Sequence, residues 1–496
     1  MLIVFGVSAI ILFYNAFRFA LPLGYAGLYA QASEQIAQAR FRLPLVIHLY
    51  GPGDVPFAYP PLAFYVMALA LDLGMSTFTY LRFVPPLLSL LALIPLYMLA
   101  ERLTHSKLGA VVAVAICAAS PALYAAHTWA SGVVRTLAFL FMLSGLYVFD
   151  RAIRQDRWFL PAVAGVFFGL VFLTHLSYAF FLVLCVACWL AARLARQSIR
   201  AAAKCTAVAV VVVIPWASLM LVRYGTGPFL DAWFTHGNTT FLGVLMQPTA
   251  LASWLSGNLS VIGVIPFLVV FVALGLMYLI SLREFTLPLL LLVSLLMLSP
   301  EGDRFIILVA AILAGASAGA AAAWLQRTRW ATPISQALLG LVAMYAIYLG
   351  FQGIQKTRPQ LEDGALKLGE YVRTTTPTQA RFLILAAPSE AEWFPYLLQR
   401  EPLASKWGAE WLGTYYSASG LVGAINDCRR AQDVECLQKL HLNLGTEDIL
   451  ITLRQDKPLT IDLESRPGCP RKTAIGQYLV WKVGCLIGSP TAEVMQ

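Results

Sequence analysis

Long apolar runs separated by short polar breaks constrain this chain more than any other feature of its sequence. A helix that crosses a bilayer needs about 20 mostly apolar residues, and the sequence offers about eleven such runs. They fall at 1–17, 82–100, 108–126, 133–149, 158–173, 176–192, 206–222, 259–280, 285–299, 305–325 and 332–352. Only 12% of the residues are charged, against roughly 25% in soluble domains. The sequence therefore predicts a mainly α-helical, polytopic membrane bundle and excludes a soluble enzyme for most of the chain.

The distribution of lysine and arginine predicts which loops face the cytoplasm. Residues 1–353 hold 19 basic and 10 acidic side chains, whereas residues 354–496 hold 16 of each, so the excess positive charge belongs to the apolar part. Basic residues beside apolar runs set membrane orientation and collect on the cytoplasmic side. We therefore exclude nucleic acid as a partner. Twelve of these residues occupy one set of alternate loops: Arg102, Lys107, Arg151, Arg154, Arg157, Arg193, Arg196, Arg200, Lys204, Arg283, Arg327 and Arg329.

With those loops cytoplasmic, the chain divides into a transmembrane domain, 1–353, and an exported soluble domain, 354–496. Two outer loops, 18–81 and 224–258, are long, and loops of this length are commonly functional. The exported domain mixes β-rich runs at 381–387, 448–453 and 478–483 with helical patterns, which predicts a small α/β fold. We expect a multi-pass protein of the bacterial inner (plasma) membrane whose C-terminal domain is periplasmic or extracellular.

The eight cysteines fall into two groups with different interpretations. Four lie in or beside apolar spans, where small packing side chains are expected. The other four lie in the exported domain, and an even number there is typical of an oxidising compartment. Of the three possible pairings, we favour Cys428 with Cys436 and Cys469 with Cys485. Because the domain contains no Cys-x2-Cys pair, we predict no metal site, and no other cofactor is indicated.

The order of features along the chain resembles the GT-C class of membrane glycosyltransferases. One span is followed by a long outer loop with a helical stretch and a Tyr-Pro-Pro-Leu segment, then by many spans and an exported α/β tail. The matching segments are Ala26–Ala37, Phe57–Tyr65, Ala119–Tyr124, Asp303–Phe305, Glu392–Tyr396 and Gly408–Trp411. The resemblance implies transfer of a sugar from a polyprenyl-phosphate lipid to a glycan, lipid or protein acceptor on the non-cytoplasmic face. It also implies that membrane lipids surround the protein.

The resemblance also implies roles for individual residues. GT-C enzymes usually place an Asp just before the helical stretch of the first outer loop, where this chain has Tyr25 or Ala26. Glu34 or Asp54 would then have to activate the acceptor. A phosphate leaving group needs cationic stabilisation, and arginine binds phosphate bidentately. We assign this role to Arg304, with Arg82 and Arg135 as alternatives. The other interpretation of Arg304 is that it pairs with Asp303 or Glu301 and extends to the membrane interface.

Aromatic and imidazole side chains in the first outer loop could form a platform for a sugar or an acceptor. We assign this role to His48, Tyr59 and Tyr65, although aromatic residues at this depth also form interfacial belts. The alternative for Glu34 is a solvated helix face, and Asp54 is equally typical of a turn. We interpret His127 as an interface group and His175 as a turn residue.

Two other functions stay open at this point. The missing Asp favours a non-catalytic relative that binds lipid-linked glycans or acts as a scaffold. The many spans also allow a lipid or polysaccharide transporter, although the spans lack the acidic residues that such pumps usually place at the bilayer midplane.

Overall fold

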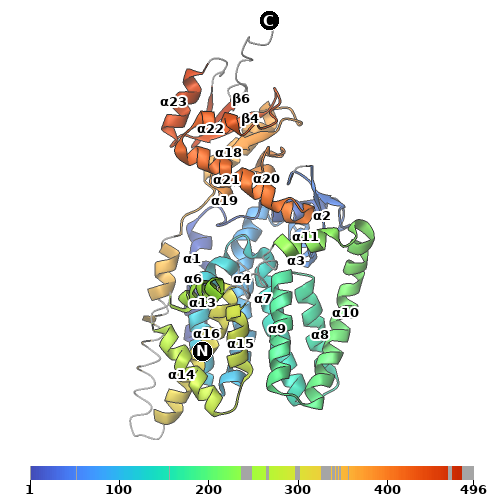
Figure 1. Cartoon of the computed structure of the whole chain (residues 1–496), viewed down its shortest axis with the longest axis vertical. Helices are drawn as coiled ribbons and strands as arrows, with labels where there is room; N and C mark the ends of the chain where they lie inside the picture. The colour runs from blue at the N-terminus through green and yellow to red at the C-terminus, as the bar shows by residue number, and fades with distance from the viewer. Residues whose placement is uncertain are drawn as a thin grey trace.

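The computed structural model describes residues 2–482 except 52, 156, 236–247, 264–266, 297–301, most of 326–347, 356 and 467–471. A bundle of long helices carries, stacked on one of its ends, a smaller α/β unit formed by the chain after residue 356 (Figure 1). This arrangement confirms the predicted fold class, a mainly helical membrane bundle with a C-terminal α/β part.

The bundle follows the predicted apolar runs closely. Ten of the eleven runs coincide with a helix or a pair of helices, while 332–352 lies largely outside the described residues. The helices are α1 (Leu2–Arg18), α4 (Thr77–Thr104), α5 (Lys107–Ala119), α6 (Pro121–Thr128), α7 (Gly132–Arg154), α8 (Phe159–Phe172), α9 (Leu176–Ala192), α10 (Arg196–Tyr224), α13 (Pro248–Gly263), α14 (Leu268–Ser281), α15 (Thr286–Leu296) and α16 (Asp303–Leu325).

Length separates these helices into two groups. Within the described residues, α4, α7, α10 and α16 are long and apolar enough to cross a membrane, and two bent pairs, α5 with α6 and α13 with α14, raise the number to as many as six. The 66° bend between α5 and α6 falls at Ser120–Pro121, where the proline lacks the amide that a continuous helix would need. The helices α1, α8, α9 and α15 are apolar but shorter, at 11 to 17 residues.

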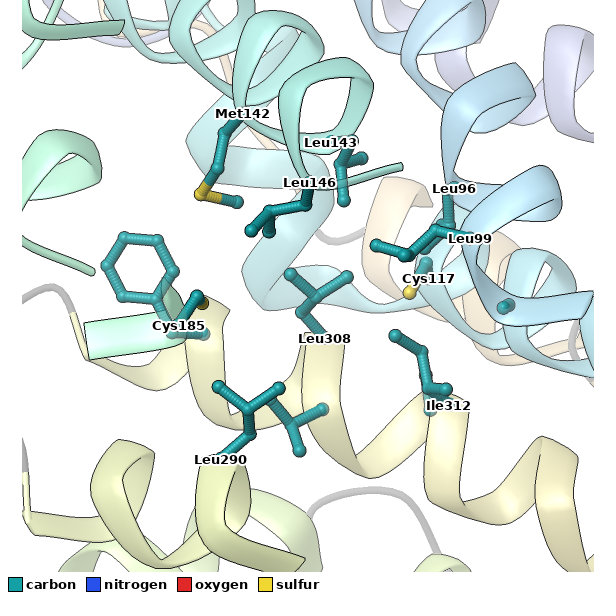
Figure 2. Close-up of a cluster of buried hydrophobic side chains, with 14 of the residues drawn as sticks. Leu96, Leu99, Cys117, Met142, Leu143, Leu146, Cys185, Leu290, Leu308 and Ile312 are labelled. Carbon is teal, nitrogen blue, oxygen red and sulfur yellow. The ribbon is translucent and has the colours of Figure 1, made fainter. Parts of the chain in front are cut away.

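Helix α16 forms the centre of the bundle. Every residue from Arg304 to Gly319 is buried, which is typical of a helix surrounded by others on all sides. Its Leu308 and Ile312 point into a cluster with leucines of α4 and α7 and with Cys117 (Figure 2). Close packing requires small residues here, since a Cβ atom on Gly315 would come within 2.3 Å of the Gly109 carbonyl oxygen. Helix α16 therefore fixes the positions of its neighbours.

The first outer loop is ordered and compact. It contains α2 (Gly27–Gln38), a short antiparallel pair of β1 (Val46–Ile47) and β2 (Val55–Pro56), and α3 (Leu62–Asp72). At 11 residues, α3 is about 16 Å long and too short to span a bilayer, as expected for the segment with two leading prolines. The second outer loop contributes α11 (Gly227–Trp233).

The α/β unit is built on a four-stranded mixed sheet in the order β3-β4-β6-β5. Strand β3 runs parallel to β4, and β6 is antiparallel to both of its neighbours. The elements are α18 (Asp363–Thr375), β3 (Phe382–Ile384), α19 (Pro388–Ala391), α20 (Phe394–Leu398), the 3-10 helix η2 (Ala409–Leu412), α21 (Tyr415–Ala431), α22 (Val434–Lys439), β4 (Ile449–Leu453), α23 (Lys457–Ser465), β5 (Thr473–Ile475) and β6 (Tyr478–Lys482).

The two faces of this sheet have different cores. One face, with Leu383, Leu450 and Trp481, packs against α21 to α23 within the unit. The other, with Phe382 and Ile451, belongs to a cluster that extends through the first outer loop to Val133 of α7. The α/β unit therefore shares half of its core with the bundle, and this shared core fixes where the two meet.

Candidate functional site

Arg304 lies at the start of α16, in the part of the bundle nearest to the α/β unit. Its side chain is buried, with only 2% of the residue exposed, and the guanidinium carbon lies 4.7 Å from the centre of the Tyr178 ring and 5.2 Å from that of Phe305. The preceding Asp303 turns its carboxylate to accept the Arg304 backbone amide at 2.8 Å. Burial among aromatic rings holds the cation away from bulk water. Its electrostatic interactions are stronger in this interior than they would be in water.

His127 connects Arg304 to a second arginine. The imidazole Nε2 lies 2.6 Å from the Tyr178 hydroxyl, and Nδ1 lies 2.9 Å from the Leu123 carbonyl oxygen. A carbonyl oxygen only accepts, so Nδ1 carries hydrogen, and in the neutral ring Nε2 accepts the Tyr178 hydroxyl. The ring also interacts electrostatically with Arg304, Arg135 and His175. Because His127 is only 3% exposed, its interpretation as an interface group is wrong.

Arg135, near the start of α7, completes a group that we call the outer cationic cluster: Arg135, Arg304, His127 and His175. Arg135 is buried, and it donates from Nη2 to the Tyr25 hydroxyl at 2.8 Å and from Nη1 to the Ser131 hydroxyl at 3.2 Å. His175 accepts the Ser177 amide at the start of α9, which agrees with its interpretation as a turn residue. Residues of α6, α7 and α16 and the residue that caps α9 thus lie together at one end of the bundle.

Tyr25 occupies the place where the resemblance expects an Asp, and the α/β unit covers it. Its ring lies 4.5 Å from the ring of Trp407, so the phenol is held between Arg135 below and the α/β unit above. Sequence reasoning did not assign a role to Trp407. The only signal in the sequence was the neighbouring segment Gly408–Trp411, which carried part of the resemblance.

The structure gives the two predicted carboxylates local partners. Glu34, on α2, accepts hydroxyl groups from Thr77 at 2.7 Å and from Tyr396. Asp54 has a positive φ of 67° in the turn before β2. Its carboxylate accepts the Leu49 amide at 3.2 Å and lies 2.7 Å from Nδ1 of His48. The contacts of Asp54 fit its interpretation as a turn residue, whereas Glu34 is half-buried and bound by two hydroxyl groups and is therefore not a solvated helix face. No contact within the described residues joins either carboxylate to Arg304 or Arg135.

The remaining predicted residues lie around the first outer loop. Arg82 donates to the carbonyl oxygen of Ala16 at 2.7 Å, which ties α4 to α1. His48 is exposed, with 57% of its side chain accessible. Tyr65 is half-buried on α3 and interacts electrostatically with Arg223. None of the three contacts the outer cationic cluster through any described residue.

Tyr59 contacts the carboxylate of Glu410, for which the sequence predicted no role. Its hydroxyl donates to Glu410 of η2, and its ring packs 4.7 Å from that of Trp411. Burial and the charge of Glu410 hold the pKa of Tyr59 well above its ordinary value, so the phenol stays protonated and acts as a donor. Residues 407–411 therefore place two tryptophans and a carboxylate against the first outer loop.

Glu392 is a second missed carboxylate, and it locks the α/β unit to the loop. Its two oxygens accept the backbone amides of Gly27 and Leu28 at 2.7 and 2.8 Å. These amides open α2, and Ala26 has no side chain that could cap them, so the cap comes from 365 residues away. Desolvation raises the pKa of Glu392 to about 7, although the backbone hydrogen bonds lower it.

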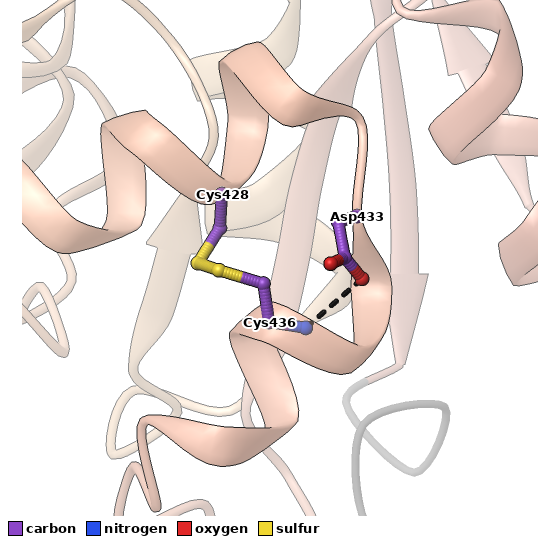
Figure 3. The surroundings of a disulfide bond; sticks show 3 residues. All are labelled: Cys428, Asp433 and Cys436. Atoms are coloured by element: carbon purple, nitrogen blue, oxygen red, sulfur yellow. Dashed lines mark hydrogen bonds between the residues drawn. A yellow bond between two sulfur atoms is a disulfide. The ribbon is translucent and has the colours of Figure 1, made fainter.

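The cysteines of the α/β unit are in part described. A disulfide joins Cys428 of α21 to Cys436 of α22, beside Asp433, which caps α22 (Figure 3). Cys469 and Cys485, the second predicted pair, lie outside the described residues. In the described part of the chain, no three His, Cys, Asp or Glu side chains converge as a metal site would require.

Comparison with known proteins supports the same architecture. The model of the dolichyl-phosphate-mannose-protein mannosyltransferase family matches residues 58–219. The curated proteins contain no match to the chain.

Solved structures extend the likeness over nearly the whole chain. The archaeal oligosaccharyltransferase AglB from Archaeoglobus fulgidus, in complex with an inhibitory peptide and dolichol-phosphate, is 14% identical. The match covers 92% of this chain and 69% of AglB with a TM-score of 0.64. ArnT from Cupriavidus metallidurans, bound to undecaprenyl phosphate, is 14% identical over 97% of both chains with a TM-score of 0.56. The mycobacterial arabinofuranosyltransferase AftD is 13% identical, over 97% of this chain and 41% of its own, with a TM-score of 0.56.

These identities are low, so the structural likeness establishes the fold alone, while the family match covers helices α3 to α10 of the bundle. Together they agree with the resemblance found in the sequence. The chain is a multi-pass membrane protein with the GT-C glycosyltransferase fold, and the family match and the fold together indicate an enzyme of that class.

Proposed function

We propose that this protein transfers a sugar from a polyprenyl-phosphate lipid to an acceptor on the non-cytoplasmic face of the membrane. The observation that carries the proposal is the outer cationic cluster, in which the buried His127 interacts with two buried arginines, Arg135 and Arg304. Both guanidinium groups lie against aromatic rings at this end of the bundle, and arginine at headgroup depth can bind a lipid phosphate bidentately. AglB and ArnT were solved with dolichol-phosphate and undecaprenyl phosphate, and this supports the same class of donor here.

In the proposed reaction, the acceptor oxygen attacks the anomeric carbon of the donor sugar. The new bond forms between these two atoms, the bond from the anomeric carbon to the phosphate oxygen breaks, and the electron pair leaves with the phosphate. Arg304 and Arg135 stabilise the charge that develops there, which is the role of preorganised cations in such a site. The acceptor proton passes to a carboxylate, for which we retain Glu34 and Asp54.

Two features support an outward-facing site. The twelve basic residues of the predicted cytoplasmic loops include Arg102 and Arg154, which meet Asp150 near the end of α7 that lies away from the α/β unit. The cluster at Arg135 lies at the other end of α7, beneath Trp407. The disulfide between Cys428 and Cys436 is typical of an oxidising compartment. An inner-membrane protein with a periplasmic or extracellular α/β unit is consistent with both features.

The test uses the full-length protein in lipid nanodiscs. Binding of undecaprenyl phosphate is measured first, followed by transfer from a panel of radiolabelled undecaprenyl-phosphate sugars to acceptors in a membrane extract. We expect Arg304→Gln to weaken lipid binding and to lower transfer by about 10²-fold or more. The exposed Arg200, changed to Gln in the same way, serves as the control and should retain both.

The acid–base role is tested separately with Glu34→Gln and Asp54→Asn. Loss of a general base lowers the rate by about 10²–10⁴-fold while lipid binding and thermal stability persist. Full transfer in both single variants would remove both carboxylates from the reaction. Wild-type protein that binds the lipid phosphate but transfers no sugar would favour the non-catalytic lipid-glycan binding protein, which the presence of Tyr25 in place of Asp also favours.

A further inference from the structure

The segment that leads into α2 carries Tyr25, and the α/β unit holds its backbone. Trp393 donates from its indole Nε1 to the carbonyl oxygen of Gly24 at 2.8 Å. On the other side of Tyr25, the carboxylate of Glu392 accepts the first two amide groups of α2 at 2.7 and 2.8 Å. Two successive residues of the α/β unit therefore hold the backbone before and after Tyr25.

The joint between this segment and the α/β unit is buried and closely packed. Glu392 and Trp393 are at most 1% exposed. The hydroxyl group of Tyr50 donates to the backbone carbonyl oxygen of Glu392 at 2.9 Å. A Cβ atom on Gly27 would come within 2.7 Å of the same carbonyl oxygen, so only glycine allows this approach. Packing of this kind leaves little room for the backbone at Tyr25 to shift.

The Tyr25 side chain extends from this fixed backbone to the outer cationic cluster. Every residue of Leu21–Ala30 is buried except Tyr25 and Tyr29. The Tyr25 hydroxyl accepts a hydrogen bond from Nη2 of Arg135 at 2.8 Å, and the ring lies 4.5 Å from that of Trp407. The α/β unit thus fixes both the backbone and the ring of Tyr25, and with them the direction in which the phenol holds Arg135.

The two amides at the start of α2 require a side chain that accepts two hydrogen bonds. Both oxygens of an ionised carboxylate accept, whereas glutamine has one accepting oxygen and a donating NH₂ group. In Glu392→Gln one of the two amides would lose its acceptor, and the start of α2 would shift. Glu390, a buried carboxyl group two residues earlier, accepts the Tyr478 hydroxyl at 2.7 Å within the α/β unit. It therefore offers a matched control.

We propose that Glu392 is a positioning residue for the transfer reaction, because its hold on the start of α2 keeps the Tyr25 phenol on Arg135 and the guanidinium group in place for the donor phosphate. The inference rests on the proposed function and gives the α/β unit a part in the reaction. Glu392 acts through Tyr25 and not on the substrate. Supporting residues of this kind keep the groups that meet a substrate in their productive geometry.

A double-mutant cycle on the full-length protein in nanodiscs tests the coupling between Glu392 and Tyr25. Transfer per folded molecule is measured at pH 8, above the pKa of about 7 of Glu392. Tyr25→Phe and Glu392→Gln should each lower kcat by about tenfold, with KM for the donor lipid changed by less than about threefold. The double variant should fall no further than either single variant, since both changes remove the same contact. Glu390→Gln should transfer at the wild-type rate.

A second measurement needs no turnover. Tyr25 is replaced by 2-fluorotyrosine, which keeps the hydroxyl group, and the ¹⁹F resonance reports the surroundings of the ring. We expect Glu392→Gln to move this resonance and Glu390→Gln to leave it unchanged. Tyr50→Phe removes a neutral hydrogen bond from the same joint and leaves the carboxylate in place, so it should move the resonance by less. The melting temperature of each variant is recorded alongside.

The two proposals fail in different ways. A resonance that moves as expected, with no transfer by the wild type from any undecaprenyl-phosphate sugar, contradicts the proposed function and still supports the placement of Tyr25 by Glu392. Transfer that depends on Arg304 but is normal in Glu392→Gln overturns the inference and leaves the reaction intact, as do additive losses in the double variant. A resonance that is the same in wild type and Glu392→Gln overturns the inference whether or not transfer is found.

Discussion

Helix α7 carries a buried charged residue near each end, and the two residues have different surroundings. Asp150 is fully buried, yet its carboxylate accepts Arg102 at 2.6 Å, Arg154 at 3.1 Å and the indole of Trp189 at 3.3 Å. Arg135 lies 15 residues earlier, about 22 Å along the helix. Its contacts include the phenol of Tyr25, the hydroxyl of Ser131 and the face of the Tyr25 ring.

The difference separates a structural charge from one suited to a ligand. Asp150 is surrounded by cations and donors that fit its charge, so it joins α4, α7 and α9 and has little capacity left for a substrate. Arg135 and Arg304 both interact with His127 and lie against aromatic rings, at the end of the bundle where we propose that the donor phosphate binds. Substitutions at the Asp150 end should therefore change stability, and substitutions at the Arg135 end should change activity.

The largest effect on stability is expected from Asp150→Asn. The change leaves Arg102 and Arg154 without their carboxylate, and breaking a buried pair costs about 3–5 kcal/mol. Their guanidinium groups are partly exposed, which places the expected loss near the lower value. Thermal unfolding in detergent or nanodiscs measures it, with the exposed Asp72→Asn as the control. An unchanged melting temperature would contradict the structural role of this end.

Arg135→Gln is expected to act on the reaction. Removal of one group that stabilises developing charge lowers the rate by about 10²–10³-fold, whereas the melting temperature should fall less than in Asp150→Asn. Transfer from the radiolabelled donor and thermal unfolding are measured on the same preparation. A large loss of stability with normal transfer per folded molecule would reverse the comparison between the two ends.

Glu392 gives a pH-dependent effect at the junction of the loop and the α/β unit. Its pKa of about 7 in the folded protein lies above the ordinary value of 4.5, so the folded state holds a proton that the unfolded state releases. This contribution to stability is present at low pH and is lost as the pH rises from about 4.5 to 7. The difference between the two pKa values limits the effect to about 3 kcal/mol.

Thermal unfolding between pH 4.5 and 8 measures this contribution. We expect Glu392→Gln to be less sensitive than wild type to pH in this range, and the exposed Glu401→Gln to follow wild type. A parallel pH dependence in wild type and Glu392→Gln would show that this carboxyl group does not titrate there.

Tyr25→Phe should have the smallest effect. It removes the hydroxyl that Arg135 binds, and a hydrogen bond to a charged group contributes about 1.5 kcal/mol or more, so transfer should fall by about tenfold. The ring contact with Trp407 is retained. Tyr371→Phe, which loses a hydroxyl contact within the α/β unit, is the matched control and should keep full activity.

Particular elements show how much of the fold and of the site could be predicted from the sequence. The apolar runs gave the bundle helices, and the β-rich runs at 381–387, 448–453 and 478–483 became β3, β4 and β6. Strand β5 was not predicted, because three residues are too few to show the apolar–polar alternation from which a strand is predicted. At the site, Arg304 and Arg135 were predicted to bind the donor phosphate. No role there was predicted for His127, Trp407, Glu410 or Glu392.

The sequence by itself determined the helices, their order in the membrane and the composition of the exported unit, because hydropathy and turn chemistry act between residues close in the chain. Only the tertiary structure decided which charged groups meet. Arg135 and Arg304 are brought to His127 by the packing of α7 and α16, and Glu392 reaches Gly27 through a core that the loop and the sheet share. Such contacts depend on the relative placement of whole elements, and no local pattern of residues specifies that placement.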